Sequence, residues 1–385
     1  MDFWFSKEQK ELKAFTREIA LEKILPKREY YDETEDFPWE MVKKLSSAGL
    51  FEVYIPEEYG GRGGGVTELC IVTEELSRVC GGIALSFAGT ALGSYPILLF
   101  GNEEQKKKYL PRIAMEGKLS AFGLTEANAG SDASAIQTQA KPVQGGYILN
   151  GTKQWITNGG EAGIYTIIAV TDRFKGARGA SAFILEKGTE GFSFGKKEKK
   201  MGIRASTTRE LVFNDCFVPK ENLIGKEGSG FVVAMKTFDK TRPGVASQAL
   251  GIAQGALDEA LNYSRKREQF GKSISSFQDI QFKLADMATQ IEAARALVYS
   301  VALLIDSGAE KISKESSMAK VFASDVAVKV TNLAVQIFGG YGYLRNYPVE
   351  KMMRDAKITQ IYEGTNEIQR SIIALNLIRE RASRK

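Results

Sequence analysis

The apolar positions of this chain follow a helical period at both ends. Over the N-terminal region they recur every three or four positions, with turn signals between the runs. The period returns after about residue 231, where one stripe continues for about eight turns at 3.6 residues each. The stripe consists of Phe277, Ile280, Leu284, Met287, Ile291, Ala294, Val298, Val301 and Ile305. This spacing is typical of a bundle seam, so we expect an N-terminal helical domain over residues 1–120 and a C-terminal four-helix bundle over residues 231–385.

A strand period separates the two helical regions. Between about residues 121 and 225, apolar residues alternate with smaller or polar ones, as at Tyr165, Ile167 and Ala169, and glycines separate the runs. This pattern predicts a middle antiparallel, barrel-like β-domain over residues 121–230. The expected fold class is therefore α+β, with the order α, β, α along the chain.

Charge and hydropathy remove several classes of function. The net charge is only +5 over 385 residues, and the densest basic run, residues 196–200, contains Glu198. This indicates a solvated turn rather than a nucleic-acid interface. No run of 18 or more apolar residues occurs, which predicts no membrane span. The N-terminus resembles no targeting leader, so we expect a cytoplasmic protein or a processed mature form.

Two further features argue against a metal site and a classical nucleotide loop. Cys70, Cys80 and Cys216 have no C-x-x-C spacing, which predicts buried free thiols in a reducing compartment and no metal site. The glycine-rich run at residues 60–65 resembles a phosphate-binding loop. It does not satisfy the G-x-G-x-x-G pattern and no Walker lysine follows it, so a Rossmann-type site is not predicted.

Glu363 is the strongest candidate for acid–base chemistry. It stands between Tyr362 and Gly364, just after a helical pattern. The glycine lets the backbone approach a ligand closely, and the aromatic neighbour reduces the water around the carboxylate and so raises its basicity. The chain contains no histidine, which excludes an imidazole base and leaves a carboxylate as the leading candidate. The alternative is that Glu363 is a solvated acid at a helix terminus.

Two turn segments of the β-domain suit a polar, planar ligand. Residues 122–132 combine small residues with hydroxyl groups, which leaves backbone N–H groups free to meet carbonyls or phosphates. In residues 155–160, Trp155 stands two positions before Thr157, so its ring can stack on a ligand while the hydroxyl bonds to the ligand's edge. The alternative for Trp155 is a tryptophan of the core.

Eight segments carry a resemblance to a known family. In the family order they are PEEYGG at 56–61, LTE at 124–126, WITNG at 155–159, FDKTR at 238–242, REQFG at 267–271, QIFGGYG at 336–342, MRDAK at 353–357 and IYEGTNEIQR at 361–370. Through them the chain closely resembles the acyl-CoA dehydrogenase family over essentially its whole length, in the branch of short- and medium-chain and butyryl-CoA enzymes. The resemblance implies the α, β, α fold, FAD bound between the β-domain and the C-terminal bundle, and usually a homotetramer.

The resemblance also implies roles for individual residues. Contacts to the flavin fall on Phe122, Leu124, Thr125, Trp155 and Thr157, with Ser131 at the junction of flavin and acyl-CoA. Contacts to the FAD pyrophosphate and adenosine fall on Arg267, Phe270, Gln278, Gln336, Gly339 and Gly340 across a subunit boundary. The adenosine end also matches Thr365 and Glu367, where the family commonly has Gln in place of Glu367. The substrate side is assigned to Ser131, Asp239, Thr241, Arg242, Tyr362 and Gly364.

The implied reaction is α,β-dehydrogenation of an acyl-CoA thioester. Glu363 would take the α-proton, its backbone N–H and a ribityl hydroxyl of FAD would bind the thioester carbonyl, and flavin N5 would accept the β-hydride. The expected electron acceptor is electron-transferring flavoprotein, and fatty acid β-oxidation is the expected setting. Isovaleryl- and long-chain relatives place their base at the position of Thr241, which cannot serve as a base here.

Several alternatives stay open at the level of sequence. The enzyme can run in reverse as an enoyl-CoA reductase, or act on a cyclic or aromatic acyl group. A non-catalytic flavin- or CoA-binding assembly partner would lack the base, whereas Glu363 is present. Acyl-CoA oxidases are usually longer, and nitroalkane oxidases use Asp as the base, which disfavours both. The segment at residues 83–96 matches the pocket floor of the family. Its small residues Ala84, Ala88 and Gly89 suggest room beyond a four-carbon chain, although Phe87 and Tyr95 can fill this space.

Overall fold

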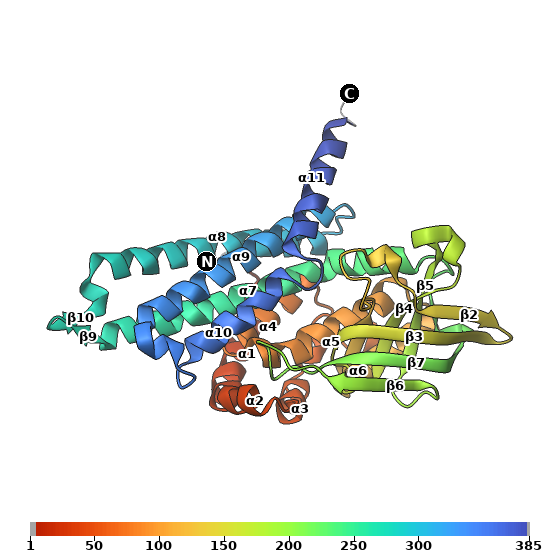
Figure 1. Cartoon of the computed structure of the whole chain (residues 1–385), viewed down its shortest axis with the longest axis horizontal. Coiled ribbons are helices and arrows are strands. Elements are labelled where there is room, and N and C mark those ends of the chain that lie inside the picture. Colours follow the sequence, from red (N-terminus) through yellow and green to blue (C-terminus); the bar gives the residue numbers. More distant parts are fainter. Residues whose placement is uncertain (1–4, 383–385) are drawn as a thin grey trace.

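The chain folds as helices, a sheet and a second group of helices, which confirms the predicted α, β, α order (Figure 1). The structure is a computed structural model and describes residues 5–382. The β-domain lies at one end of the molecule, and the long C-terminal helices extend away from it (Figure 1). Helices α4 and α5 pack against α7, and α5 also contacts the sheet, so these helices join the three regions.

The N-terminal helices begin where side chains can satisfy their free N–H groups. At α1 the Ser6 side chain accepts a hydrogen bond from the Gln9 N–H, and the Gln9 side chain accepts one from the Ser6 N–H. Asn102 and Gln105 form the same reciprocal cap at α6. The helices of this region are α1 (Lys7–Ile19), α2 (Arg28–Thr34), α3 (Trp39–Ser47), α4 (Val66–Ser77), α5 (Gly81–Phe100) and α6 (Glu103–Ala114).

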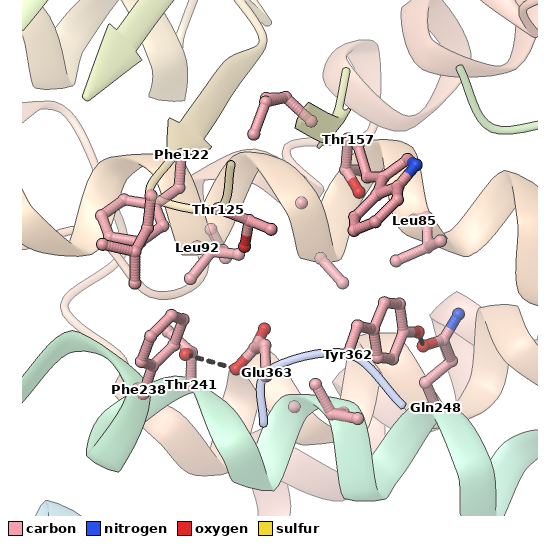
Figure 2. A pocket seen from close by; sticks show the side chains of 18 of the residues that line it. Leu85, Leu92, Phe122, Thr125, Thr157, Phe238, Thr241, Gln248, Tyr362 and Glu363 are labelled. Carbon is pink, nitrogen blue, oxygen red and sulfur yellow. Dashed lines mark hydrogen bonds between the residues drawn. The ribbon is translucent and has the colours of Figure 1, made fainter. Parts of the chain in front are cut away.

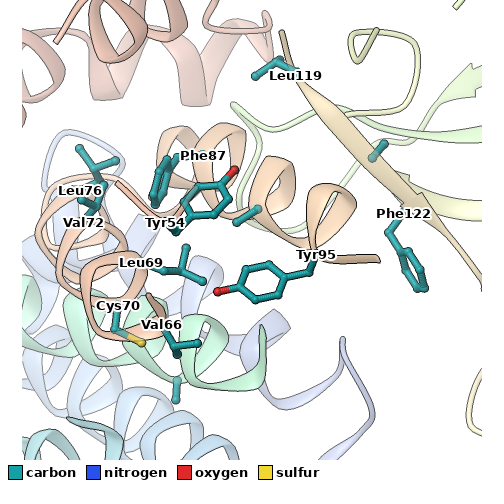
Figure 3. Packing of buried hydrophobic residues seen from close by; sticks show 14 of the residues in the cluster. Tyr54, Val66, Leu69, Cys70, Val72, Leu76, Phe87, Tyr95, Leu119 and Phe122 are labelled. Carbon is teal, nitrogen blue, oxygen red and sulfur yellow. The ribbon is translucent and has the colours of Figure 1, made fainter. Parts of the chain in front are cut away.

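The large aromatic residues of α5 point into the N-terminal core. The ring of Phe87 lies 5.7 Å from that of Phe51 and 5.9 Å from that of Tyr54. Tyr95 stacks on Tyr54 with ring centroids 6.0 Å apart (Figure 3). Phe87 and Tyr95 therefore pack among the N-terminal helices.

The middle domain is built on an eight-stranded sheet with the order β6-β7-β3-β2-β4-β5-β8, and β1 pairs with β4 outside this path. Most neighbouring strands are antiparallel. Strands β1 and β2 are parallel to β4, however, so the prediction of an antiparallel domain is wrong at these two pairings. The strands are β1 (Ser120–Gly123), β2 (Gln139–Val143), β3 (Gly146–Thr157), β4 (Ile164–Val170), β5 (Ala180–Glu186), β6 (Phe192–Lys197), β7 (Thr208–Pro219) and β8 (Leu223–Ile224).

A bulge interrupts the pairing of β3 with β7. The register shifts between Lys153 and Ile156, and within this interval Trp155 adopts a φ of 59°. A bulge bends the strand and redirects the side chains next to it. Here the bulge takes the Trp155 side chain out of the regular alternation of side chains between the two faces of the sheet, and Trp155 is 56% exposed.

Four helices form the C-terminal bundle. Helices α7 (Gly230–Lys266), α8 (Gln278–Asp306) and α9 (Ser313–Phe338) pack against one another, and α10 (Pro348–Lys357) packs against α7 and α9. A small hairpin of β9 (Glu268–Gln269) and β10 (Lys272–Ser273) joins α7 to α8, and α11 (Asn366–Ala382) projects from the body (Figure 1). The predicted seam lies on α8, where its buried members are Met287, Ile291, Ala294, Val298, Val301 and Ile305.

Three helical stretches within residues 5–382 are long and apolar enough to cross a membrane when judged by length and composition alone: α5, α8, and Ser313–Tyr343, which contains α9. The sequence expectation missed them because polar residues interrupt each apolar run. In the fold, 72% of the apolar window of α5 is buried, as in a core helix. The windows of the other two stretches are only 44% and 50% buried, and these helices expose the apolar residues Phe282, Leu303 and Leu304 on α8 and Phe322 on α9.

Candidate active site

A cavity of about 120 Å³ lies where β1, the end of β3, α5, α7 and the turn before α11 meet (Figure 2). On α7 its wall is formed by Thr241, Val245 and Gln248, which share one helix face at steps of three and four residues. Leu85 and Leu92 form part of the opposite wall on α5. The site residues predicted from sequence that line this same cavity are Phe122, Leu124, Thr125, Trp155, Thr157, Thr241, Tyr362 and Glu363.

Glu363 lies in a tight turn between Ile358–Gln360 and α11. Its φ is 50°, a left-handed value that is costly for a residue with a Cβ, and Gly364 follows with a φ of 90°. Gln369 holds this turn, because its side-chain Nε2 donates to the carbonyl oxygens of Glu363 at 3.0 Å and Gly364 at 3.2 Å. The backbone N–H of Glu363 has no hydrogen-bond partner among residues 5–382, so it is available to a ligand carbonyl.

The carboxylate of Glu363 faces the cavity, and Thr241 Oγ1 donates a hydrogen bond of 2.8 Å to its Oε2 (Figure 2). Burial raises the pKa of Glu363 from 4.5 to about 7, against the opposing effects of the Thr241 hydrogen bond and the positive charges of Arg242 and Lys320. The alternative of a solvated acid at a helix terminus does not fit this geometry, because the carboxylate lines the cavity and is hydrogen-bonded to Thr241. A carboxyl group with this pKa can accept a proton near neutral pH.

The opposite side of the cavity carries a flat aromatic surface with two hydroxyl groups. Trp155 lines the cavity with its exposed indole, so the alternative of a core tryptophan is also wrong. Thr125 and Thr157 line it too, and neither hydroxyl bonds to another part of the described chain. An aromatic plane with unpartnered hydroxyls is chemically suited to a planar heteroaromatic ring such as a flavin.

A buried ion pair joins the two segments that form this aromatic side. Lys153 is fully buried, and its Nζ donates to Glu126 Oε1 at 2.6 Å and to the Leu124 carbonyl at 3.0 Å. The Glu126 carboxylate also accepts the backbone N–H groups of Gln137 and Thr138. The segment after β1 is thereby fixed to the end of β3, which carries Trp155.

A second predicted set lies elsewhere on the chain, in an open groove of about 400 Å³ at the tip of the bundle. Arg267, Gly339 and Gly340 line this groove, and the Arg267 guanidinium lies over the Tyr341 ring at 5.4 Å. Phe270 (93% exposed), Gln278 and Gln336 are exposed but do not line this groove.

The groove and the cavity are far apart within one chain. Gln248 and Arg267 are 19 positions apart on and just beyond α7, which corresponds to roughly 28 Å of helix. Figure 1 shows the β9–β10 hairpin at the end of the molecule opposite the sheet. One chain therefore does not bring both predicted sets around a single ligand.

The remaining predicted substrate and cofactor residues lie around the turn or outside the cavity. Asp239 and Arg242 are buried and do not line the cavity, and the Arg242 guanidinium lies 3.0 Å from the Asp239 carboxylate. Ser131 is exposed on the loop after β1. Thr365 caps the start of α11 by accepting the Ile368 N–H, and Glu367 is exposed beside it. The roles of these residues in CoA and FAD binding stay predictions.

Some residues of the site were not predicted from the sequence. Gln248 accepts a hydrogen bond from the Tyr362 hydroxyl and donates one of 3.0 Å to the Gly81 carbonyl, which adds a second polar pair to the cavity wall (Figure 2). The shared helical face of Thr241, Val245 and Gln248 is the signal that can reveal such a residue. Cys70, Cys80 and Cys216 are free and buried, as predicted.

Comparison with known proteins places all three parts of the chain in one family. Residues 6–117, 121–216 and 228–378 match the family models for the N-terminal, middle and C-terminal domains of acyl-CoA dehydrogenases. The chain is 51% identical over 381 residues to a short-chain specific acyl-CoA dehydrogenase of Clostridium acetobutylicum, covering 98% of this chain and all of the relative. It is 49% identical over 381 residues to an acryloyl-CoA reductase (NADH) of Anaerotignum propionicum, covering 98% and 96%.

Solved structures show the same relationship. Butyryl-CoA dehydrogenase from Megasphaera elsdenii has a TM-score of 0.96 at 49% identity, covering 98% of this chain and 100% of that one. A chain solved in work on the electron transferring flavoprotein of Acidaminococcus fermentans has the same TM-score and coverage at 52% identity. An acyl-CoA dehydrogenase from Bacillus anthracis in complex with FAD has a TM-score of 0.92 at 38% identity, covering 99% of this chain and 68% of that one.

Proposed function

Because this chain belongs to the acyl-CoA dehydrogenase family of FAD-dependent oxidoreductases, we propose that it dehydrogenates an acyl-CoA thioester to the 2-enoyl-CoA with Glu363 as the base. The observation that carries this proposal is a carboxyl group with a pKa near 7 that shares a small cavity with the exposed indole of Trp155. When bound against Trp155, Thr125 and Thr157, FAD supplies the acceptor for the hydride of the β-carbon.

The chain's own residues supply the acid–base part of the reaction. The free backbone N–H of Glu363 binds the thioester carbonyl, which makes the α-proton more acidic because charge developing on that oxygen is stabilised. Thr241 orients the carboxylate toward the cavity. An acyl chain that enters the cavity excludes water and raises the basicity of Glu363 further. Glu363 then takes the α-proton.

This role of Glu363 predicts the pH dependence. The base works as a carboxylate, and its pKa is raised to about 7, so kcat/KM should rise with pH and reach half of its maximum near pH 7. Below pH 7, kcat/KM should fall about tenfold for each pH unit. The measurement is the rate of anaerobic flavin bleaching at limiting substrate across the pH range. A profile already flat from pH 5 upward would place the working group near its ordinary pKa of 4.5 and contradict the assignment.

The acyl group is proposed to be short and unbranched. Phe87 and Tyr95 pack away from the cavity and do not fill it, and its wall on α5 is apolar, made by Leu85, Ala88, Gly89, Ala91 and Leu92. The short-chain and butyryl-CoA relatives support the same substrate class.

Enlarging Ala88 should test this wall. In Ala88→Leu, kcat/KM for the longest accepted acyl-CoA should fall by at least about tenfold while the shortest is spared, because each excluded methylene costs about 1 kcal/mol or more. Ala88→Gly is the matched control and should not impose this penalty. Gly89 is a poor site for the test, since an added Cβ would lie 2.8 Å from Thr157 Cγ2. An equal fall in kcat/KM for acyl groups of every length would show that Ala88 does not line the acyl pocket.

Assembly and electron transfer are also part of the proposal. The separation of the cavity from the Arg267 groove, together with the exposed apolar faces of α8 and α9, supports a homotetramer in which a neighbouring chain completes each FAD site. The structure solved in the context of electron transferring flavoprotein supports such a flavoprotein as the electron acceptor. We place the enzyme in the cytoplasm, in fatty acid β-oxidation.

The reverse reaction is a second candidate, favoured by the acryloyl-CoA reductase relative. The same base and cavity serve either direction, because protonation of the α-carbon reverses its deprotonation. Two rates distinguish the directions of the reaction. One is enoyl-CoA reduction with a reduced flavoprotein donor, and the other is acyl-CoA oxidation with the oxidised flavoprotein acceptor.

A further inference from the structure

Lys320 is a fully buried lysine on α9, close to the turn that carries Glu363. Its Nζ donates hydrogen bonds of 2.9 Å to the Gly364 carbonyl and 2.9 Å to Asn366 Oδ1. A buried ammonium is costly unless it is hydrogen-bonded or paired. The position therefore needs an explanation beyond packing, since an apolar side chain of similar length would fill the same space.

Lys320 and Gln369 both donate hydrogen bonds to the turn, and both reach the Gly364 carbonyl. Gly364 is the residue directly after the base, and Asn366 is the first residue of α11. Asn366 Nδ2 also donates to Ser324 Oγ at 2.9 Å and to Asp325 Oδ1 at 2.8 Å. One face of α9 thus fixes both the left-handed turn and the start of the following helix.

The charge of Lys320 also acts on the base. Two cations face Glu363: Arg242 from α7, which is paired with Asp239, and Lys320 from α9. Both favour the ionised carboxylate. Burial lowers the pKa of Lys320 to about 7, while the negative charges of Glu363, Asp325 and Glu367 oppose this shift. The two groups consequently favour each other's charged forms and titrate as a pair.

From this geometry we infer that Lys320 is a positioning residue for catalysis, which holds the left-handed turn of Glu363 and keeps its carboxylate ionised. It does not touch the substrate cavity and transfers no proton to the substrate. The inference rests on the proposed role of Glu363 as the base, and it adds a residue that determines both the orientation and the proton affinity of that base.

The test measures proton abstraction separately from hydride transfer. The probe is a 3-thia-acyl-CoA, in which sulfur replaces the β-carbon so that no hydride can leave. The FAD-loaded enzyme is incubated with it in D₂O, and mass spectrometry follows exchange of the α-protons as a function of pH. The variants are Lys320→Met, which keeps the length of the side chain and removes its charge and donors, and Lys314→Met as the control on the same helix. Lys314 pairs with Glu315 and Glu380 near the surface.

In Lys320→Met, the plateau rate of exchange should fall by about tenfold to a hundredfold, because the carboxylate is misplaced. The midpoint of the acid limb should also move to higher pH by about one unit, because loss of a neighbouring positive charge raises the pKa of a carboxyl group. Lys314→Met should keep the wild-type midpoint. Asn366→Ala, which retains the ammonium, should lower the plateau without moving the midpoint, and it serves if Lys320→Met does not fold.

Contrary outcomes separate the two levels of the argument. Wild-type exchange with an unmoved midpoint and a plateau within twofold in Lys320→Met would overturn the role of Lys320 alone. An equal shift in Lys314→Met would overturn it as well, because any charge on α9 would then have the same effect. Absence of exchange in the wild-type enzyme would overturn the role of Glu363 and the inference together.

Discussion

Glu363→Gln should slow flavin reduction by acyl-CoA by about three to four orders of magnitude, the upper range for removal of a general base. The amide is close in size to the carboxyl group and can keep a hydrogen bond to Thr241, so the cavity should retain its shape. FAD content and acyl-CoA binding should stay nearly unchanged. Anaerobic stopped-flow bleaching of the flavin band measures the rate, and titration with a product analogue measures binding.

A second substitution, at Thr241, should restore part of the rate that is lost without Glu363. Thr241 Oγ1 lies 2.8 Å from Glu363 Oε2, so a carboxylate that grows from position 241 can reach the same region of the cavity. Thr241→Glu combined with Glu363→Gly should recover part of the lost rate, whereas Glu363→Gly alone should not. Flavin reduction at nearly the wild-type rate in Glu363→Gln would show that another group takes the proton.

Arg267→Ala should weaken FAD binding by about tenfold to a hundredfold and destabilise the tetramer. A hydrogen bond from a charged group to a phosphate contributes about 1.5–3 kcal/mol, which corresponds to this range of affinity. Arg267 lines the open groove with Gly339 and Gly340, far from the cavity of its own chain, so its partner is expected to be the FAD of a neighbouring subunit. Flavin retained after dilution and mass by light scattering report the two effects.

The control for this prediction is Arg265→Ala, on the last turn of α7. Arg265 is exposed and does not line the groove, so the same loss of charge should leave FAD and assembly unchanged. A colourless but fully assembled Arg267→Ala tetramer would contradict the prediction, because FAD would then be lost without loss of the tetramer. A yellow Arg267→Ala variant with the wild-type affinity for FAD would show that Arg267 does not contact FAD.

The parts of the fold with a strong period were predictable. The apolar stripe of α8 repeats at three and four residues, and its members from Met287 to Ile305 are buried, whereas Phe277, Ile280 and Leu284 are only partly buried. Helix α5 is different, because it is apolar on nearly all sides. Without a polar face, its sequence does not show that Phe87 and Tyr95 point into the core while Ala88 lines the cavity.

Backbone geometry limited the prediction of the site. Glu363 was identifiable from its neighbours and from the absence of histidine, but its left-handed φ was not, because non-glycine residues rarely adopt it. The bulge at Trp155 and the parallel pairing of β1 depend on contacts between distant segments. Lys320 was missed for the same reason: it precedes Gly364 by 44 positions and meets it only in the folded chain.

The most direct test of the account is a single turnover of the purified wild-type enzyme. Anaerobic mixing with butyryl-CoA should bleach the flavin absorbance and produce one 2-enoyl-CoA per FAD, with the rate of bleaching rising through about pH 7. If a panel of straight, branched and cyclic acyl-CoA thioesters left the bound flavin oxidised at every pH, the proposed dehydrogenation at Glu363 would be wrong.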